Sequence, residues 1–148
     1  MRALTLLRHA RADWPAGRYA DRDRPLDPRG VGDAKAAAQA LAGAPRRPTL
    51  VLASPAQRTL ETARILCAAL ALPPPALCED ERLYLASRDT LLQVLQELDS
   101  GARSVALVGH NPGLSELAAH LSPAGHPSLA TAQFLRLFLP ITSWTALR

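Results

Sequence analysis

Three short apolar runs set the main constraint on the fold of this chain. They cover residues 3–7, 49–53 and 104–108, contain β-branched residues and are bounded by charged or turn residues. Such runs are typical of strands that are buried on both faces. Segments in which apolar residues recur at helical spacing lie between them. Strands that alternate with helices indicate an α/β domain built on a mostly parallel sheet.

The expected helices follow from this spacing and from the residues at their ends. Asp27 is suited to cap a helix with Pro28 in its first turn, and Ser54 with Gln57 forms a capping-box pattern. Near the C-terminus, polar and apolar residues alternate as in a peripheral strand. The predicted helices span residues 27–43, 54–72, 87–101 and 113–121, and the predicted peripheral strand spans residues 132–139.

Length and composition fit one globular unit. The chain has 148 residues, a size typical of one domain, so we expect a single domain over residues 1–148. Hydrophobic residues make up 48% of the chain and charged residues 20%, which argues against a disordered or collagen-like protein.

The basic residues bear on the class of partner. The net charge is +4, and all but one of the 17 basic residues are arginine, Lys35 being the exception. Arginine is suited to phosphate because its guanidinium is a bidentate donor, although a GC-rich genome would produce the same bias. We expect no nucleic-acid partner, because aromatic residues are 4% of the chain and Arg46-Arg47 is the only adjacent basic pair.

Neither a membrane span nor an export signal is expected. Residues 66–77 are alanine-rich and interrupted by prolines, and the N-terminal apolar segment is too short for a signal peptide. We therefore expect a cytoplasmic protein without a membrane partner. Cys67 and Cys78 lack CxxC spacing, so buried thiols are expected rather than a disulfide or a metal site, and no cofactor is expected.

Polar residues follow each of the three predicted buried strands. Arg8 and His9 follow the first, the segment from Ser54 to Arg58 follows the second, and His110 follows the third. In open α/β sheets ligands bind beyond the carboxyl ends of the strands, so these segments are expected to share one pocket. The helix that follows Ser54 would also aim backbone N–H groups at an anion.

Two imidazoles and two guanidiniums in one pocket suit phosphoryl transfer. A neutral His9 could attack phosphorus and carry the phosphoryl group, while Arg8 and Arg58 neutralise its equatorial oxygens. A hydrogen bond from the other ring nitrogen of His9 to a backbone carbonyl would fix the required tautomer. A protonated His110 would add a positive donor. The arrangement requires no metal.

Four ordered blocks of residues resemble a known family. They are Leu7-Arg8-His9-Ala10, Arg24-Pro25-Leu26 with Gly30, Ser54-Pro55-Ala56-Gln57-Arg58 with Thr62, and Val108-Gly109-His110-Asn111-Pro112. The first is similar to the Arg-His-Gly signature of the histidine phosphatase superfamily, with Ala10 in place of glycine. Together with the short length, the blocks look most like the SixA branch, the phosphohistidine phosphatases.

The resemblance covers residues 3–121 and implies a phosphoglycerate-mutase-like fold, a three-layer α/β/α sandwich with a mostly parallel central sheet. It implies that His9 is the nucleophile and that Arg8, Arg58 and His110 are catalytic phosphate ligands; Asn111 is expected beside them. The implied activity is a metal-independent phosphatase with a covalent phosphohistidine intermediate on His9. Its expected partner is a phosphorylated substrate, foremost a phosphohistidine-bearing protein.

The chain departs from the family's pattern at two further places. Larger members have an asparagine that helps bind phosphate, where this chain has Pro15, and a carboxylic acid where this chain has Tyr84 and Leu85. An imidazole, with a pKa of about 6.5, leaves phosphorus more readily than an alkoxide does. A site without a strong general acid therefore favours substrates with an N–P bond. The stand-in acids, each otherwise a solvated loop charge, are Asp13, Asp21, Asp23 and Glu81.

Other functions stay open at this point. They are a small-molecule or nucleotide phosphomonoesterase of the same superfamily, a non-catalytic phosphate-binding module, and a metal hydrolase that uses His9 and His110. The metal hydrolase lacks HxxxH or HxH spacing. His120 and His126 receive no role. The loop of residues 11–24, with its arginines, is expected to select among substrates at an open site.

Overall fold

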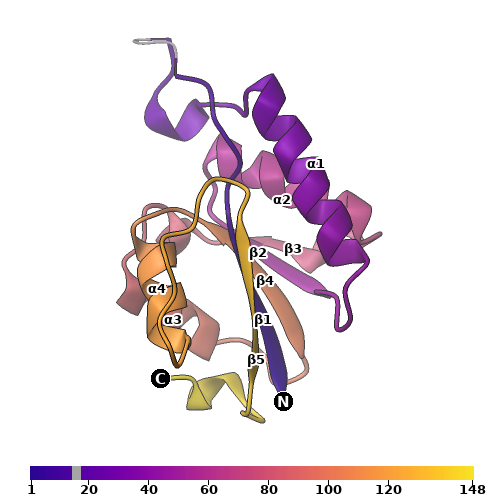
Figure 1. Cartoon of the computed structure of the whole chain (residues 1–148), viewed down its shortest axis with the longest axis vertical. Helices are drawn as coiled ribbons and strands as arrows, with labels where there is room; N and C mark the ends of the chain where they lie inside the picture. Colours follow the sequence, from indigo (N-terminus) through magenta and orange to yellow (C-terminus); the bar gives the residue numbers. More distant parts are fainter. Residues whose placement is uncertain (15–17) are drawn as a thin grey trace.

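The computed structural model describes residues 1–14 and 18–148, and it consists of a five-stranded sheet flanked by helices (Figure 1). The strands are β1 Arg2–Arg8, β2 Leu50–Ala53, β3 Leu77–Glu79, β4 Ser104–Gly109 and β5 Phe134–Leu139. The helices are α1 Pro28–Ala42, α2 Gln57–Ala69, α3 Arg88–Gln96 and α4 Gly113–Leu121. The short 3-10 helices are η1 Asp21–Asp23, η2 Pro74–Ala76, η3 Glu81–Leu83 and η4 Trp144–Ala146. Within the described residues, no helix is long and apolar enough to cross a membrane.

The strands lie in the order β3-β2-β4-β1-β5. The first four of these are parallel, and β5 is antiparallel to β1 at the edge of the sheet. The predicted mostly parallel sheet with a peripheral strand is therefore confirmed. The sequence analysis missed β3, because three residues after a proline-rich segment are too few to display a period.

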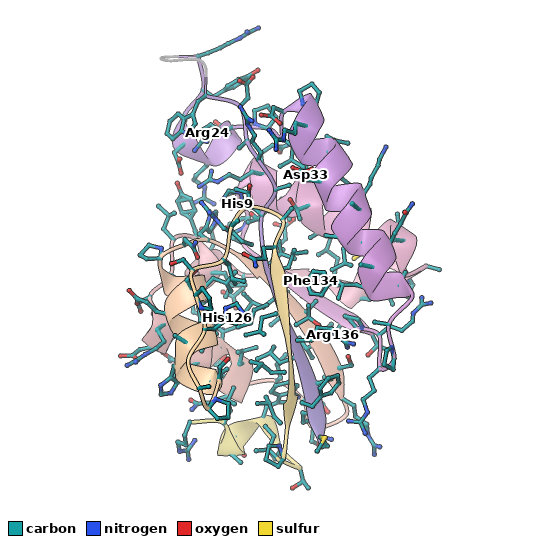
Figure 2. All side chains as sticks on the ribbon, in the orientation of Figure 1. His9, Arg24, Asp33, His126, Phe134 and Arg136 are labelled. Carbon is teal, nitrogen blue, oxygen red and sulfur yellow. The ribbon has the colours of Figure 1, made fainter. Side chains whose placement is uncertain are left out.

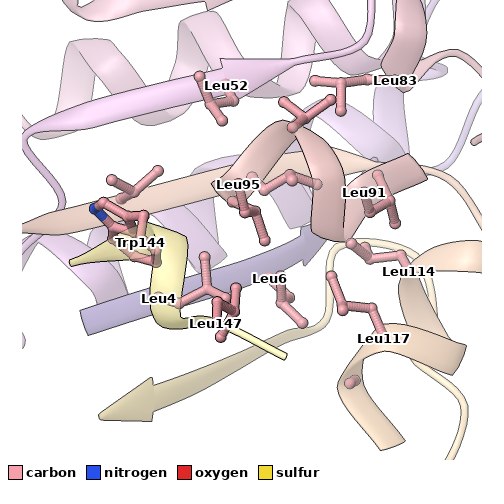
Figure 3. Close-up of a cluster of buried hydrophobic side chains, with 14 of the residues drawn as sticks. Leu4, Leu6, Leu52, Leu83, Leu91, Leu95, Leu114, Leu117, Trp144 and Leu147 are labelled. Carbon is pink, nitrogen blue, oxygen red and sulfur yellow. The ribbon is translucent and has the colours of Figure 1, made fainter. Parts of the chain in front are cut away.

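Helices cover both faces of the sheet, α1 and α2 on one and α3 and α4 on the other (Figure 1). Successive residues of a strand point to opposite faces, so each central strand contributes to two cores. Leu6 and Leu107 belong to the core under α3 and α4, and Leu7 and Val108 belong to the core under α1 and α2. Figure 3 shows the first core, in which Trp144 of η4 lies at one end, beside Leu4 and Leu147. The predicted three-layer α/β/α fold is confirmed.

The predicted cap of α1 is confirmed. The Asp27 carboxylate accepts a hydrogen bond from Gly30 N at 2.7 Å, and the Ser87 hydroxyl caps α3 in the same way. The predicted end of α3 is wrong, since the helix stops at Gln96 rather than near residue 101. There the Asp99 carboxylate accepts from a backbone N–H two residues later and closes a turn instead.

The predicted cap of α2 is wrong. Helix α2 begins at Gln57 with Ala56 as its N-cap residue, and no side chain caps it. Ser54 is completely buried, and its hydroxyl lies 2.7 Å from a ring nitrogen of His110. The Gln57 side chain donates to Glu61 rather than closing a capping box. Ser54 therefore contacts His110 instead of capping the helix.

The cysteines are less buried than predicted. Cys67 and Cys78 are both free and half-buried. Cys67 packs against the core under α1 and α2, where burial raises the pKa of its thiol. Cys78 lies in the short strand β3 and packs against the opposite core.

Candidate active site

The ends of β1 and β4 and the first turn of α2, the helix that follows β2, line a cavity of about 450 Å³. These strands are neighbours, and backbone hydrogen bonds tie their ends together. His9 N donates to Gly109 O at 3.2 Å, and Ser54 N donates to Val108 O at 3.3 Å. Figure 2 labels His9 beyond the end of β1, with Arg24 from the following loop above it. Segments that are distant in sequence thus meet at the sheet edge where α/β proteins bind ligands.

His9 is buried at this edge, and its ring is oriented by the next residue. Nδ1 lies 2.8 Å from the carbonyl oxygen of Ala10, which is the backbone acceptor that the sequence analysis expected. Burial above all, together with the positive charges of Arg58, Arg8 and Arg24, lowers the pKa of His9 to about 4, against the hydrogen bond to Ala10, which raises it. The imidazole is therefore neutral at pH 7, with Nε2 unprotonated.

Arg58 comes from the first turn of α2 and is buried, so it is not an ordinary exposed helix residue. One of its amino groups donates to the Asp21 backbone carbonyl at 2.7 Å, and the other lies 3.1 Å from the Asp21 carboxylate. Arg8, at the end of β1, donates to Leu129 O at 3.2 Å. Both arginines line the cavity, and burial, followed by the charge of Arg58, lowers the pKa of Arg8. Two guanidiniums so close together favour an anion between them.

His110 lies beside His9, with 5.4 Å between the ring centroids. Its Nδ1 accepts from Arg58 at 3.3 Å, so its proton is on Nε2, which donates to the Ser54 hydroxyl at 2.7 Å. Burial and then the charge of Arg58 lower the pKa of His110 to about 3. His110 is therefore neutral at pH 7 in this arrangement and acts as a hydrogen-bonding group without a positive charge, because a buried imidazole next to a guanidinium stays uncharged.

Asn111 also lines the cavity, but its amide is used within the protein. Its oxygen accepts from the backbone and the hydroxyl of Ser115, and its Nδ2 donates to Leu129 O at 2.8 Å. These bonds tie the start of α4 to the chain that precedes β5. A structural role is evident from the geometry, and the phosphate-binding role of Asn111 stays a prediction.

The sequence analysis missed two residues of the cavity wall. Arg24 is buried, lines the cavity and contributes to lowering the pKa of His9. Its guanidinium lies 3.3 Å from the ring centroid of Trp14, which is 72% exposed at the same cavity. The Arg24-Pro25-Leu26 block was the available signal for Arg24. For Trp14 the loop sequence contained none.

Among the carboxylates considered as stand-in acids, Asp13 lines the cavity. Glu81 forms an exposed ion pair with Arg22 at 2.7 Å, which lowers the pKa of Glu81. Asp23 is exposed in η1. Of these three, Asp13 is therefore placed to reach a leaving group.

The fourth carboxylate, Asp21, is partly exposed but is paired with side chains of other segments. Its carboxylate accepts a short hydrogen bond from the Tyr84 hydroxyl and pairs with Arg24 and Arg58, each at 3.1 Å. The bond from Tyr84 and then the arginines lower the pKa of Asp21 to about 2. A carboxylate that stays ionised in this way is a poor proton donor near neutral pH.

The remaining predictions concern residues away from the cavity wall. His120 is exposed on α4, and Nδ1 of His126 hydrogen-bonds to Pro127 O, so neither joins the pair at the strand ends. Pro15, where larger superfamily members have an asparagine, lies outside the described residues. In residues 1–14 and 18–148 no three metal-ligating side chains of the His, Cys, Asp and Glu types come together.

Comparison with known proteins gives matches over most of the chain. Residues 4–83 match the model of the histidine phosphatase superfamily (branch 1). An uncharacterized protein of Mycobacterium tuberculosis is 33% identical over 147 residues, which cover 96% of this chain and 86% of that protein. These matches extend through the strands, helices and loops described above.

Two solved structures are similar throughout. A protein assigned as the phosphohistidine phosphatase SixA from Agrobacterium tumefaciens is 28% identical with a TM-score of 0.78, over 91% of this chain and 90% of that one. The protein histidine phosphatase SixA in complex with tungstate is 26% identical with a TM-score of 0.82, over 93% and 88% of the two chains. Both resemble this chain in fold and length.

Proposed function

Because the chain belongs to the histidine phosphatase superfamily, we propose that it is a metal-independent phosphatase that uses His9 as its nucleophile. One observation carries the proposal. A neutral, buried His9 has its Nδ1 proton engaged by Ala10 O, which leaves the Nε2 lone pair for attack in a cavity lined by Arg8, Arg58 and His110. Such a cavity combines a nucleophile with cationic and hydrogen-bonding groups suited to a phosphoryl group.

The reaction proceeds in two displacements. In the first, the Nε2 lone pair of His9 forms a bond to phosphorus while the bond from phosphorus to the leaving atom breaks. Arg8 and Arg58 neutralise the equatorial oxygens, where charge is spread in the transition state. In the second, water attacks the phosphorus of phospho-His9 while the bond from phosphorus to Nε2 breaks and its electron pair returns to Nε2. One proton of the water passes to solvent, and inorganic phosphate and neutral His9 are released.

We propose a protein-borne phosphohistidine as the substrate. The SixA neighbours, at 28% and 26% identity, support this class. Tyr84, which stands where larger superfamily members have a carboxylic acid, donates a hydrogen bond to Asp21 and leaves that position without a strong acid. An imidazole leaving group needs less protonation than an alkoxide, so the site is matched to N–P bonds.

A small-molecule phosphomonoester is the second candidate substrate, and Asp13 is the observation that favours it. Asp13 lines the cavity, and its side chain in the protonated form could donate a proton to an alkoxide. On this alternative, Asp13→Asn would lower kcat for an alkyl phosphate at least tenfold. On the phosphohistidine proposal, the same variant leaves turnover of a phosphohistidine peptide within about twofold.

The test is a substrate panel with and without the His9 side chain. Wild type, His9→Ala and the matched control His120→Ala are assayed on a phosphohistidine peptide, an aryl phosphate and an alkyl phosphate. We expect the highest kcat/KM for the peptide, loss of turnover in His9→Ala alone, and trapped label on His9 after a rapid acid-free quench. Equal kcat/KM for the alkyl phosphate would refute the phosphohistidine substrate. Phosphate binding without any turnover would identify a non-catalytic binding module instead.

A further inference from the structure

Asp21 contacts Arg58 through two different groups. The backbone carbonyl accepts from Nη1 of Arg58 at 2.7 Å, and the carboxylate accepts from Nη2 at 3.1 Å. The same Nη2 reaches Nδ1 of His110 at 3.3 Å. Among the described residues, Arg58 lines the cavity whereas Asp21 does not. Asp21 therefore contacts both amino groups of the guanidinium without itself lining the cavity.

Asp21 is itself held from two directions. The Tyr84 hydroxyl donates to Oδ2, and Arg24 Nη1 donates to Oδ1 at 3.1 Å. Arg24 is fixed in turn, because its Nε donates to Asp13 O at 2.9 Å and its guanidinium stacks on Trp14. These contacts connect η1 to the loops on both sides of the cavity. The Asp21 carboxylate is thus held in place by Tyr84 and Arg24 independently of its contact with Arg58.

The negative charge of Asp21 stabilises the guanidinium of Arg58 in its buried position. Arg58 is buried close to Arg8 and next to a neutral His110. In the part of the chain that the structure describes, its ion-pair partner is Asp21. A long side chain that is held by paired, charge-assisted hydrogen bonds loses less entropy when it binds an anion. Catalysis is sensitive to such placement, because small displacements of a binding group reduce the rate strongly.

We infer that Asp21 is a positioning residue, which holds the Arg58 guanidinium at the cavity wall in the orientation that binds the phosphoryl oxygens. The inference rests on the proposed function for the identity of the anion. According to this inference, a residue of η1 affects the rate of turnover although Asp21 does not line the cavity.

A double-mutant cycle tests the inference. Asp21→Asn, Arg58→Ala and the double variant are compared with wild type by kcat/KM on p-nitrophenyl phosphate. We expect Asp21→Asn to lower kcat/KM by about tenfold in wild type and by less than about twofold once Arg58 is absent, because the effect passes through Arg58. The control Asp23→Asn changes an exposed carboxylate of the same 3-10 helix and should have less than about twofold effect in either background.

One ratio decides the result. If Asp21→Asn reduces kcat/KM at least three times more in the Arg58 background than in the Arg58→Ala background, the inference stands, and a smaller ratio overturns it. Thermal unfolding shows whether Asp21→Asn is folded. If it is not, the same ratio is measured for Tyr84→Phe, which removes one hydrogen bond from the carboxylate and keeps every charge.

A second readout separates this inference from the proposed function. Titration calorimetry with inorganic phosphate on the same four proteins gives a cycle that needs no turnover. The inference stands if Asp21→Asn raises Kd at least three times more with Arg58 present than in the Arg58→Ala background, and a smaller ratio overturns it. Full turnover by His9→Ala would refute the proposed function, and the phosphate cycle would still decide the role of Asp21.

Discussion

His9 Nδ1 lies 2.8 Å from the carbonyl oxygen of Ala10, a hydrogen bond between adjacent residues at the end of β1. Because a carbonyl only accepts, Nδ1 carries the proton and Nε2 keeps its lone pair. His110 has the opposite arrangement, since its Nδ1 accepts from Arg58 and its Nε2 donates to Ser54. The two imidazoles of one site therefore hold opposite tautomers, and only His9 has a free lone pair on Nε2.

These tautomers are directly measurable. Long-range proton–nitrogen NMR correlations at neutral pH should give His9 the Nδ1–H pattern and His110 the Nε2–H pattern. The reason is that each ring has one nitrogen committed to a fixed acceptor or donor. The exposed His120 is the internal reference for a ring without such contacts. Nε2–H on His9 would contradict the proposed nucleophile.

The two histidines should also make the fold sensitive to acid. Their folded pKa values, about 4 for His9 and about 3 for His110, lie below the usual 6.5, so the unfolded chain binds more protons between these values. The stabilisation is complete above pH 6.5 and is lost as pH falls toward the folded values.

Each histidine should lower the free energy of unfolding by on the order of 2 kcal/mol between pH 7 and pH 5. Urea unfolding at the two pH values measures the loss, and His110→Gln should remove about half of it. Equal pH dependence in wild type and His110→Gln would show that His110 is not buried in its neutral form. His120→Gln is the control.

Much of this architecture was predictable from local pattern. The apolar runs predicted β1, β2 and β4, and the parallel register of these strands then brings Arg8, His9 and His110 to one edge. This works because strands that are buried on both faces have a strong hydrophobic signal, and because ligand sites follow the carboxyl ends of parallel strands.

What could not be predicted depends on tertiary contacts. Ser54 has the pattern of a helix cap, yet its hydroxyl bonds to His110, which is distant in sequence. Asp21 lies in a charged loop typical of solvent exposure, and only the fold brings Arg58 and Tyr84 against it. Capping and charge patterns describe local preference, whereas the contacts of the Ser54 and Asp21 side chains are determined by partners on other elements.

Ser54→Ala should destabilise the protein through His110. The substitution removes the acceptor of a buried ring N–H and leaves that group without a hydrogen bond. We expect the free energy of unfolding to fall by about 1–3 kcal/mol, measured by urea denaturation at pH 7. Ser128→Ala, at an exposed position, should stay within about 0.5 kcal/mol of wild type. An unchanged stability for Ser54→Ala would mean that another group accepts this proton.

Chelation separates the proposed mechanism from a metal hydrolase. If His9 carries the phosphoryl group and arginines neutralise its charge, turnover should be unaffected by dialysis against excess EDTA. The measurement is kcat/KM on an aryl phosphate before and after chelation, with added Mg²⁺ and Zn²⁺ as the reverse test. A loss above tenfold that a metal restores would contradict the His9 mechanism.

Two glycines of α1 provide a matched pair that relates helix packing to the cavity. A Cβ at Gly30 would lie 2.0 Å from the backbone oxygen of Arg11, whereas at Gly32 it would meet nothing within 4 Å. Gly30→Ala must therefore displace the segment of Arg11, which lines the cavity and is paired with Asp27 at 2.8 Å. Gly32→Ala changes only the helix preference of an exposed position.

The two variants should move stability in opposite directions. Gly32→Ala should raise the free energy of unfolding by about 0.5–1 kcal/mol and leave kcat/KM unchanged. Gly30→Ala should lower it by about 1–3 kcal/mol and reduce kcat/KM as well, because the displaced backbone belongs to the cavity wall. Thermal unfolding and aryl phosphate turnover measured on both variants make the comparison. If Gly30→Ala matched Gly32→Ala in both readouts, the close approach of α1 to the Arg11 segment would have no part in shaping the site.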